Sequence, residues 1–325
     1  MCAILNHRIT GRSAWVTTDL ADETGWVRIL TQDEIGSLDR ALHQVKSSGK
    51  PFPNFTKDDF HIPELVELLS ELSEELENGR GFSVMRGLPV ERYTDDEINI
   101  IYYGIGLKLG IPVRQNPRGD LLGNVMNVGD LADKSTRVYE TNAYLPYHTD
   151  PSDVVGLLCL RQAKSGGLSS LVSVASVYNQ LLSDHPDTLE ALYAPWFYAH
   201  LGEDLPTPSP LFSYHQGKLA FRYLRQYIEL GHEMMNVPLT QKQIHALDVL
   251  DQVTAQDHLR LSMLMRPGDL QWANNYAVMH SRTDFEDFDE PERRRKKLRL
   301  WLKMPNAREL APDFPGRNGF PAPKR

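Results

Sequence analysis

Two histidines and one aspartate have the residue types and the spacing that could hold a metal ion. His148 and Asp150 are separated by one residue in the stretch 144–150 (YLPYHTD), and His280 lies far downstream. Residues i and i+2 of a strand point to the same face, so this imidazole and this carboxylate can meet one ion, joined by the distant imidazole. Such a set leaves other positions on the metal open, as in non-haem Fe(II) oxygenases. We therefore take His148, Asp150 and His280 as candidate metal ligands and as the candidate catalytic centre.

A histidine and an acidic residue spaced in this way are weak evidence alone. With 11 histidines and 43 acidic residues among 325, about one or two such triplets are expected by chance, and the chain holds two. The second is His185-Pro186-Asp187, where a proline and an acidic residue are typical of the first turn of a helix. We predict a structural or surface role for His185, whereas His148 lies between two expected strands. For His280 taken alone, a hydrogen-bonded core histidine is the more common interpretation.

Two more segments could bind an anion. Ser169 follows the pair Gly166-Gly167, which fits a hairpin turn but could also present the serine hydroxyl to an anionic cosubstrate. The basic run 293–302 (RRRKKLRLWL) could be a solvated face or a helix that begins at Pro291. If the run is a strand, one face carries a set of mostly basic side chains, namely Arg295, Lys297, Arg299 and Trp301. A guanidinium that points into a core needs a carboxylate partner, and its planar shape suits bidentate binding of one.

Composition limits the classes of protein. The chain has 41% hydrophobic and 24% charged residues, and its formal net charge of -8 argues against nucleic-acid binding. Two cysteines give neither a disulfide framework nor zinc-site spacing, and no signal peptide or membrane span stands out. We therefore expect a soluble, cytoplasmic protein whose partner is a small-molecule substrate, with no nucleic acid and no membrane; a homo-oligomer stays open.

The candidate residues need a β-rich scaffold to position them. Capping patterns and apolar spacing predict one helix that begins near residue 31, a second that begins near residue 63 and a third over residues 94 to about 110. From residue 137 onward, helices are expected at 176–194 and 240–256, among short strands at 138–141, 154–160, 169–174, 218–223, 259–265, 269–274 and 298–304. This pattern predicts a mixed α/β, β-rich fold: a jelly-roll core with flanking helices. We expect a single catalytic domain over residues 1–325, in which the N-terminal helical part, about residues 1–80, braces the β core.

Taken together, these residues resemble the TauD/TfdA-like taurine dioxygenase family of Fe(II)- and 2-oxoglutarate-dependent oxygenases. The resemblance covers residues 81–304 and rests on the histidine–aspartate triplet, the Gly-Gly-x-Ser turn, the distal histidine and the later Arg-x-x-x-Arg. It implies a double-stranded β-helix with iron bound by His148, Asp150 and His280. It also implies that Arg295, aided by Ser169, holds the distal carboxylate of 2-oxoglutarate, with Arg299 near the cosubstrate or an anionic substrate.

The implied reaction consumes O2 and 2-oxoglutarate and releases succinate and CO2. Asp150 argues for oxygenation, because relatives that halogenate carry a small residue in its place. The substrate is expected to be a small carboxylate-bearing or specialised metabolite, and hydroxylation is the simplest outcome. Asn142, Tyr144 and Tyr147 are candidate substrate residues, although the two tyrosines could equally be packing aromatics. Arg222 and Arg225 could meet an acidic substrate, but a surface role is the expectation for both. Two alternatives stay open, a zinc or other metal hydrolase and a non-catalytic jelly-roll binding protein.

Overall fold

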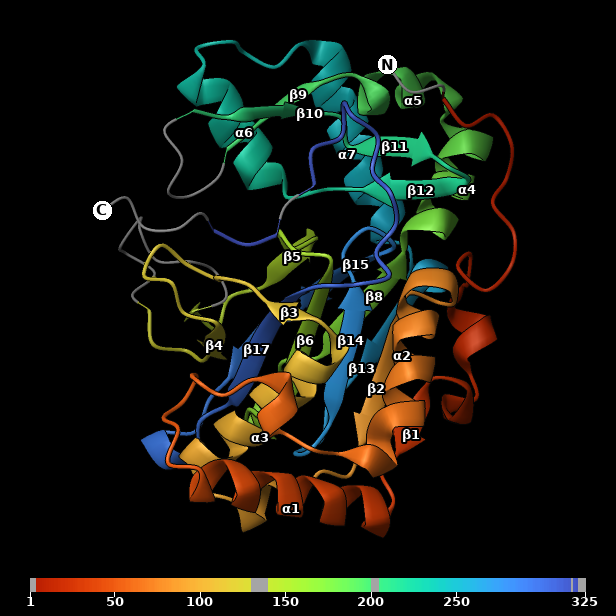
Figure 1. The fold of residues 1–325 in the computed structure, drawn as a ribbon. Helices are drawn as coiled ribbons and strands as arrows, with labels where there is room; N and C mark the ends of the chain where they lie inside the picture. The colour runs from red at the N-terminus through yellow and green to blue at the C-terminus, as the bar shows by residue number, and fades with distance from the viewer. Residues whose placement is uncertain (1–3, 130–139, 200–204, 317, 321–325) are drawn as a thin grey trace.

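Two facing β-sheets form the centre of the molecule in a computed structural model, which describes residues 4–129, 140–199, 205–316 and 318–320 (Figure 1). The major sheet has seven strands: β1 (Val27–Ile29), β2 (Phe82–Arg86), β3 (Ile111–Pro112), β4 (Leu122–Val125), β6 (Val154–Arg161), β14 (Leu270–Asn274) and β17 (Lys296–Lys303). The minor sheet has four strands: β5 (Leu145–His148), β8 (Ser169–Ser173), β13 (Arg260–Met263) and β15 (Val278–Arg282). The predicted β-rich double-stranded β-helix is confirmed.

The major sheet separates two kinds of side chain along its long strand β17. Leu298, Leu300 and Leu302 pack in an apolar cluster with the N-terminal helices, whereas Trp301 belongs to the cluster between the sheets. This is the period-two alternation of a strand with both faces covered. The basic run is therefore a strand rather than a helix, apart from one 3-10 turn at Pro291–Arg293. The side chains at positions 295, 297, 299 and 301 are all buried.

The minor sheet repeats this alternation. Leu171 and Val278 lie in the cluster between the sheets, while Val172, Met279 and Tyr147 lie in the cluster on the opposite face. Antiparallel pairing sets His280 directly opposite His148, and Arg282 opposite Ser169. The register therefore sets a pair of histidines beside a pair of residues that could bind an anion, all on the inner face.

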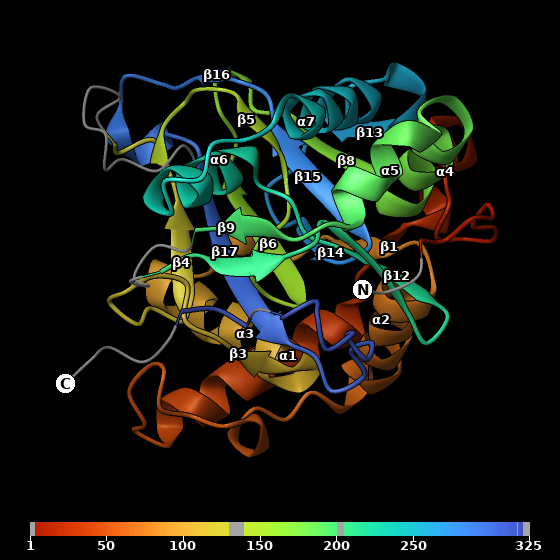
Figure 2. The ribbon, with the colours of Figure 1, turned by 90° about the horizontal axis from the view of Figure 1, so that it is seen from above.

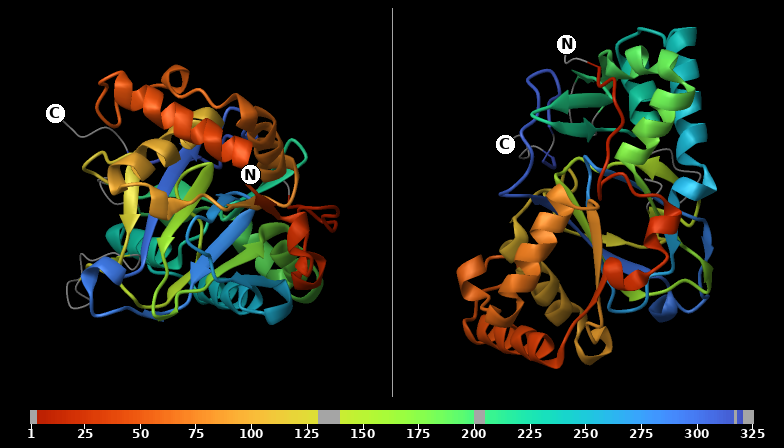
Figure 3. Two further views of the ribbon diagram at one scale, coloured as in Figure 1. Left: turned by 90° about the horizontal axis from the view of Figure 1, so that it is seen from below. Right: turned by 90° about the vertical axis from the view of Figure 1, so that its right-hand side faces the viewer.

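Seven α-helices in the described part of the chain form two groups on opposite sides of the sheets (Figures 1 and 3). The first group covers the outer face of the major sheet: α1 (Gln32–Ser47), α2 (Val66–Asn78) and α3 (Asp95–Leu109). The second group lies with the minor sheet: α4 (Val174–Asp184), α5 (Pro186–Tyr193), α6 (Arg225–Met234) and α7 (Gln241–Thr254). Each group buries an apolar face against its own sheet, and a further apolar cluster lies between the two sheets.

Three short strand pairs complete the fold. They are β7 (Ser165–Gly166) with β16 (Phe285–Glu286), β9 (Trp196–Tyr198) with β10 (Thr207–Ser209), and β11 (Phe212–His215) with β12 (Lys218–Phe221). The strands β9 to β12 lie above the sheets in Figure 1, and Figure 2 shows them from that side, together with α6. A backbone bond joins the segment that follows β12 to the end of the strand that carries His148, because Thr149 donates to the carbonyl of Tyr223 at 2.8 Å.

Most of the predicted elements are present, with two corrections. Thr31 and Thr94 cap α1 and α3 through complete capping boxes, and Pro63 begins the 3-10 turn that leads into α2. The helix predicted over 176–194 is two helices, because His185 adopts a non-helical backbone between α4 and α5. The strand predicted over 138–141 is wrong at 140–141, which form a turn, and 138–139 lie outside the described residues. In the described part of the chain, no helix has the length and apolar character needed to cross a membrane.

Candidate active site

His148, Asp150 and His280 meet on the inner face of the minor sheet. One ligand atom from each lies within 4.8 Å of the others, and the two imidazole rings are 4.2 Å apart between centroids. The Nε2 atom of His280 lies 3.6 Å from one carboxylate oxygen of Asp150, and that of His148 lies 3.9 Å from the other. The structure thus brings together all three residues that the sequence singled out as metal ligands.

The protonation of both histidines suits a metal. Burial lowers the pKa of His280 to about 3, with the neighbouring His148 as the second cause, and burial also lowers the pKa of His148. Both rings are therefore neutral near pH 7, the form that binds a metal. The Nδ1 atom of His148 lies 2.8 Å from the carbonyl of Pro146, which fits an Nδ1–H donor and leaves the lone pair on Nε2. His280 Nε2 is buried without a hydrogen-bond partner among the described residues, which fits a metal ligand.

Asp150 is held as an anion. Burial alone would raise its pKa, but electrostatic interaction with Arg299 first, and then with the two histidines, lowers the pKa below its ordinary value. Trp301 donates from Nε1 to the carboxylate at 2.9 Å, and the backbone N–H of Asp150 donates to the side chain of Asn275 at 2.9 Å. Hydrogen bonds of this kind orient a ligand and tune a metal.

We call the three candidate ligands His148, Asp150 and His280 the metal cluster. Beside the metal cluster lies a second group of buried residues: Ser169, Arg282, Arg295 and Lys297. All are at most 5% exposed. Lys297 donates from Nζ to the Ser169 hydroxyl at 3.1 Å, and the guanidinium groups of Arg282 and Arg295 lie 4.8 and 5.0 Å from the ring centre of Phe285. We call these four residues the cationic pocket. The structure places the predicted pair Ser169 and Arg295 together here, and it adds Arg282 and Lys297.

The Gly-Gly turn that precedes Ser169 also serves this pocket. Gly166 and Gly167 both have positive φ, 72° and 70°, which favours glycine. A Cβ atom on Gly166 would lie 2.3 Å from the carbonyl of Asp284, and one on Gly167 would lie 3.4 Å from Arg295 Nε. The turn therefore allows the chain to pass close to Arg295.

Arg299 lies beside the metal cluster, which we call the metal end of the site, rather than in the cationic pocket. Its guanidinium is 3.9 Å from the Asp150 carboxylate and 4.5 Å from the ring centre of Trp301, and its Nε donates to the buried side chain of Gln115 at 2.8 Å. This fixed position places one cationic group beside the metal cluster.

The candidate substrate residues are dispersed. Tyr147 packs on the outer face of the minor sheet, where it bonds to Ser170 and Ser281, so its side chain points away from the metal cluster. Tyr144 is 52% exposed, and Asn142 is half-buried and accepts a backbone bond from Phe285.

The two arginines expected at the surface differ from each other. Arg225 is partly exposed and pairs with Asp248, Asp251 and Glu229. The surface role predicted for Arg222 is wrong, because this side chain is buried with its guanidinium 4.0 Å from the ring centre of Tyr198. It directly follows the buried residues Ala220 and Phe221 at the end of β12.

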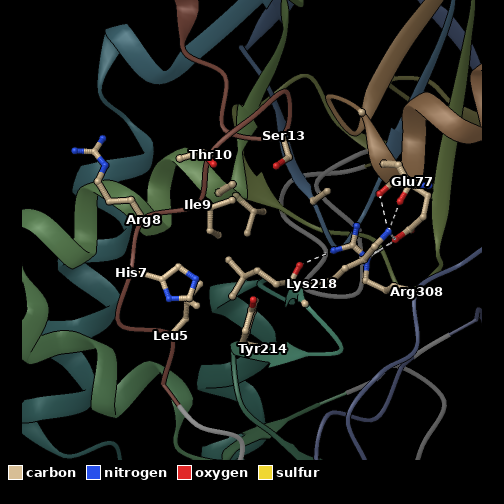
Figure 4. Close-up of a pocket in the computed structure, with 17 residues that line it drawn as sticks. Leu5, His7, Arg8, Ile9, Thr10, Ser13, Glu77, Tyr214, Lys218 and Arg308 are labelled. Carbon is tan, nitrogen blue, oxygen red and sulfur yellow. Dashed lines mark hydrogen bonds and ion pairs between the residues drawn. The ribbon is translucent and has the colours of Figure 1, made fainter.

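A cavity of about 360 Å³ opens elsewhere, between the N-terminal segment and the β11–β12 hairpin (Figure 4). Its lining contains no residue of the metal cluster or of the cationic pocket. Its main charged groups are already paired, since Glu77 accepts from both Lys218 at 2.6 Å and Arg308 at 3.1 Å. The cavity is therefore separate from the candidate chemistry.

Sequence reasoning missed several residues that complete the site. Arg282 is two residues beyond His280 on a strand, so the spacing that joined His148 to Asp150 could have identified it. Lys297 shares its strand face with Arg295 in the basic run, so the same alternation identifies it. Asn275 and Gln115 had no signal, because their contacts depend on segments that are distant in the sequence.

Comparisons with known proteins agree with this geometry. The family described as taurine catabolism dioxygenase TauD, TfdA family matches residues 48–301. FR-33289 synthase from Streptomyces rubellomurinus is 31% identical over 320 residues, which cover 95% of this chain and 94% of that protein.

Solved structures show the same fold. An asparagine oxygenase in complex with Fe(II), (2S,3S)-3-hydroxyasparagine and succinate aligns with a TM-score of 0.68 at 20% identity, over 86% of this chain and 93% of that one. The non-heme iron oxygenase OrfP in complex with Fe and alpha-ketoglutaric acid aligns with a TM-score of 0.65 at 16% identity, over 85% and 93%.

Proposed function

The chain belongs to the TauD/TfdA family of Fe(II)- and 2-oxoglutarate-dependent dioxygenases, and from this premise we propose that it hydroxylates a small carboxylate-bearing or specialised metabolite. His148, Asp150 and His280 would hold the iron, and Arg295 with Ser169 would hold the distal carboxylate of 2-oxoglutarate. The observation that carries the proposal is the single inner face on which a neutral-histidine and carboxylate cluster lies beside a buried cationic pocket. 2-Oxoglutarate has a keto-acid end that can chelate a metal and a distal carboxylate, so its binding needs both the metal ligands and the cationic pocket.

The bound iron would supply oxidative decarboxylation of 2-oxoglutarate, with succinate and CO2 as products, coupled to oxidation of the substrate. The residues of this chain have other tasks. Trp301 and Asn275 hold Asp150 in place, and the bond to Pro146 fixes the tautomer of His148. His148, Asn275 and Trp301 are buried, so bulk water has little access to them.

A substrate with an anionic group fits two buried guanidinium groups near the metal cluster. Arg299 lies beside Asp150. Arg222 stacks on Tyr198 and precedes Tyr223, which exchanges backbone and side-chain bonds with Thr149, the residue between the first two metal ligands. The asparagine oxygenase complex contains 3-hydroxyasparagine, an amino acid that also carries a carboxylate.

Two further features belong to the proposal. We regard residues 1–325 as one catalytic domain braced by its N-terminal part, since α1 and α2 share an apolar cluster with β14 and β17. The hydrolase and binding-protein alternatives have no comparable support, because neither needs a cationic pocket beside the metal ligands.

Anaerobic reconstitution with Fe(II) and 2-oxoglutarate tests this function. We expect a weak visible charge-transfer band that is absent in His148→Ala and strongly weakened in Arg295→Ala. Succinate release, measured with a panel of carboxylate-bearing metabolites, then identifies the substrate class. Hydrolytic activity with tight zinc binding and no band would contradict the proposal.

A further inference from the structure

The cationic pocket holds more positive charge than one carboxylate needs. Arg282, Arg295 and Lys297 are each at most 4% exposed, and none has a carboxylate within ion-pair distance among the described residues. Arg282 Nε and Nη1 and Arg295 Nη1 are buried without a hydrogen-bond partner in the same part of the chain. A buried, unpaired cation is costly, so three together indicate an anion that these groups are built to bind.

The carboxylates nearby do not serve this purpose. Asp269 is engaged by Arg86 in a two-pronged ion pair, with bonds of 2.9 and 3.1 Å. Asp287 accepts the backbone N–H of Arg295 at 2.7 Å rather than its guanidinium. The positive charge of the pocket is thus available to a ligand.

The proposed function gives a role to Ser169 and Arg295 but none to Lys297. Its Nζ atom lies 3.1 Å from the Ser169 hydroxyl and 3.0 Å from the sulfur of Met265, so the ammonium group is held beside the hydroxyl that would contact the cosubstrate. The preceding residue shows the contrast, because Lys296 points outward and pairs with Asp95 at 2.7 Å. Alternation along β17 therefore directs one lysine to an aspartate and the other into the pocket.

We propose that Lys297 is a binding residue for the distal carboxylate of 2-oxoglutarate, and that it acts with Arg295 and Arg282 as a three-cation clamp that selects a dianionic cosubstrate. This inference rests on the proposed function. The clamp distinguishes 2-oxoglutarate from 2-oxovalerate, a 2-oxo acid of the same length with a methyl group in place of the distal carboxylate. Each cation adds a charge-assisted contact that only the dicarboxylate can make.

The test compares Lys297→Met with the matched control Lys296→Met. The affinity of the anaerobic Fe(II) enzyme for each 2-oxo acid is measured from the charge-transfer band or by calorimetry. We expect Lys297→Met to weaken 2-oxoglutarate binding about 10-fold to 100-fold, with the affinity for 2-oxovalerate unchanged and Lys296→Met like the wild type. Lys297→Gln, which keeps a donor to Ser169 but loses the charge, should behave as Lys297→Met does and serves if the methionine variant does not fold.

Thermal unfolding of the metal-free protein separates binding from structure. Because Lys297 is a buried cation without an ion pair among the described residues, Lys297→Met should leave Tm unchanged or raise it. A lower Tm together with equal losses for both 2-oxo acids would show a structural role and overturn the proposal, as would wild-type affinity in Lys297→Met. Absence of the band in the wild type is a different result, which removes the proposed function and the clamp with it.

Discussion

At the metal end of the site one buried carboxylate is surrounded by groups that stabilise it, whereas in the cationic pocket three buried cations lie together without such a partner. Asp150 has Trp301 at 2.9 Å and Arg299 at 3.9 Å, and its pKa is lowered despite its burial. In the pocket, burial lowers the pKa of Lys297 to about 7 and that of Arg282 to about 10, with the charge of Arg295 as the second cause in both.

This difference separates the buried charges that the protein itself balances from the buried charges that a ligand must balance. Partners that already balance a charge orient it, so the protein itself preorganises the metal end. Unbalanced charge is a cost until a counter-ion arrives, so the cationic pocket gives up stability for affinity. Substitutions at the two ends should therefore have opposite effects on the metal-free protein.

The largest effect is expected from Asp150→Ala. Loss of an anionic ligand should weaken Fe(II) binding more than about 100-fold, since changes to the groups that merely support a ligand already cost 10-fold to 100-fold. Fe(II) titration and succinate release provide the measurement. The control is Asp187→Ala in the second histidine–aspartate triplet, which should keep both; equal losses in the two variants would mean that Asp150 has no special role.

The second effect concerns the pocket. Arg295→Met should lower the affinity for 2-oxoglutarate about 100-fold through the loss of a bidentate charged contact, while Fe(II) affinity without cosubstrate stays near the wild-type value. Separate titrations with Fe(II) and with 2-oxoglutarate check this division. Weakened Fe(II) binding in this variant would show that the two ends are not independent.

The residues changed in these two variants could both be predicted from the sequence. His148, Asp150 and His280 could be chosen because strand periodicity and order along the chain limit where they can meet, and the second triplet could be set aside because Pro186 begins a helix. The same periodicity predicted the inner face of β17. Local rules therefore sufficed wherever one strand determines the direction of a side chain.

The remaining residues depend on pairing between distant segments. Arg282 reaches the pocket because β15 pairs with β8 in a register that sets it opposite Ser169. Gln115 reaches Arg299 from a loop far away in the sequence, and Arg222 is buried against Tyr198 rather than placed by any motif. Only the folded chain determines these contacts.

Trp301→Phe should have a moderate effect at the metal end. The substitution removes the hydrogen bond to Asp150 but keeps an aromatic ring between the sheets, so Fe(II) affinity should fall about 10-fold. The metal-free protein should lose about 1–3 kcal/mol of unfolding free energy, because a buried carboxylate loses a donor. Chemical denaturation measures that loss, which contrasts with the unchanged or increased stability expected for Lys297→Met. A stability gain in both variants would remove the contrast between the two ends.

The smallest effect is a pH dependence of cosubstrate binding. Lys297 is faced by Arg295, which directly precedes β17, by Arg282 on β15, by Cys159 on β6 and by the nearby Asp269, and its own pKa lies near neutrality, at about 7. The cosubstrate carboxylate should raise this pKa, so the complex binds more protons than the free enzyme does and affinity falls as pH rises.

Below about pH 6 the lysine is charged in both states, and the affinity for 2-oxoglutarate should change little. Between pH 7 and pH 8 it should fall about fivefold in the wild type and in Lys296→Met, because most of the free enzyme must first take up a proton. Lys297→Met should bind weakly with little pH dependence over the same range. Calorimetric titration in buffers of different ionisation enthalpy measures the number of protons taken up when 2-oxoglutarate binds. Uptake by the wild type but not by Lys297→Met assigns the proton to Lys297. Equal uptake by both would place the titrating group elsewhere and leave the pocket with fixed charges only.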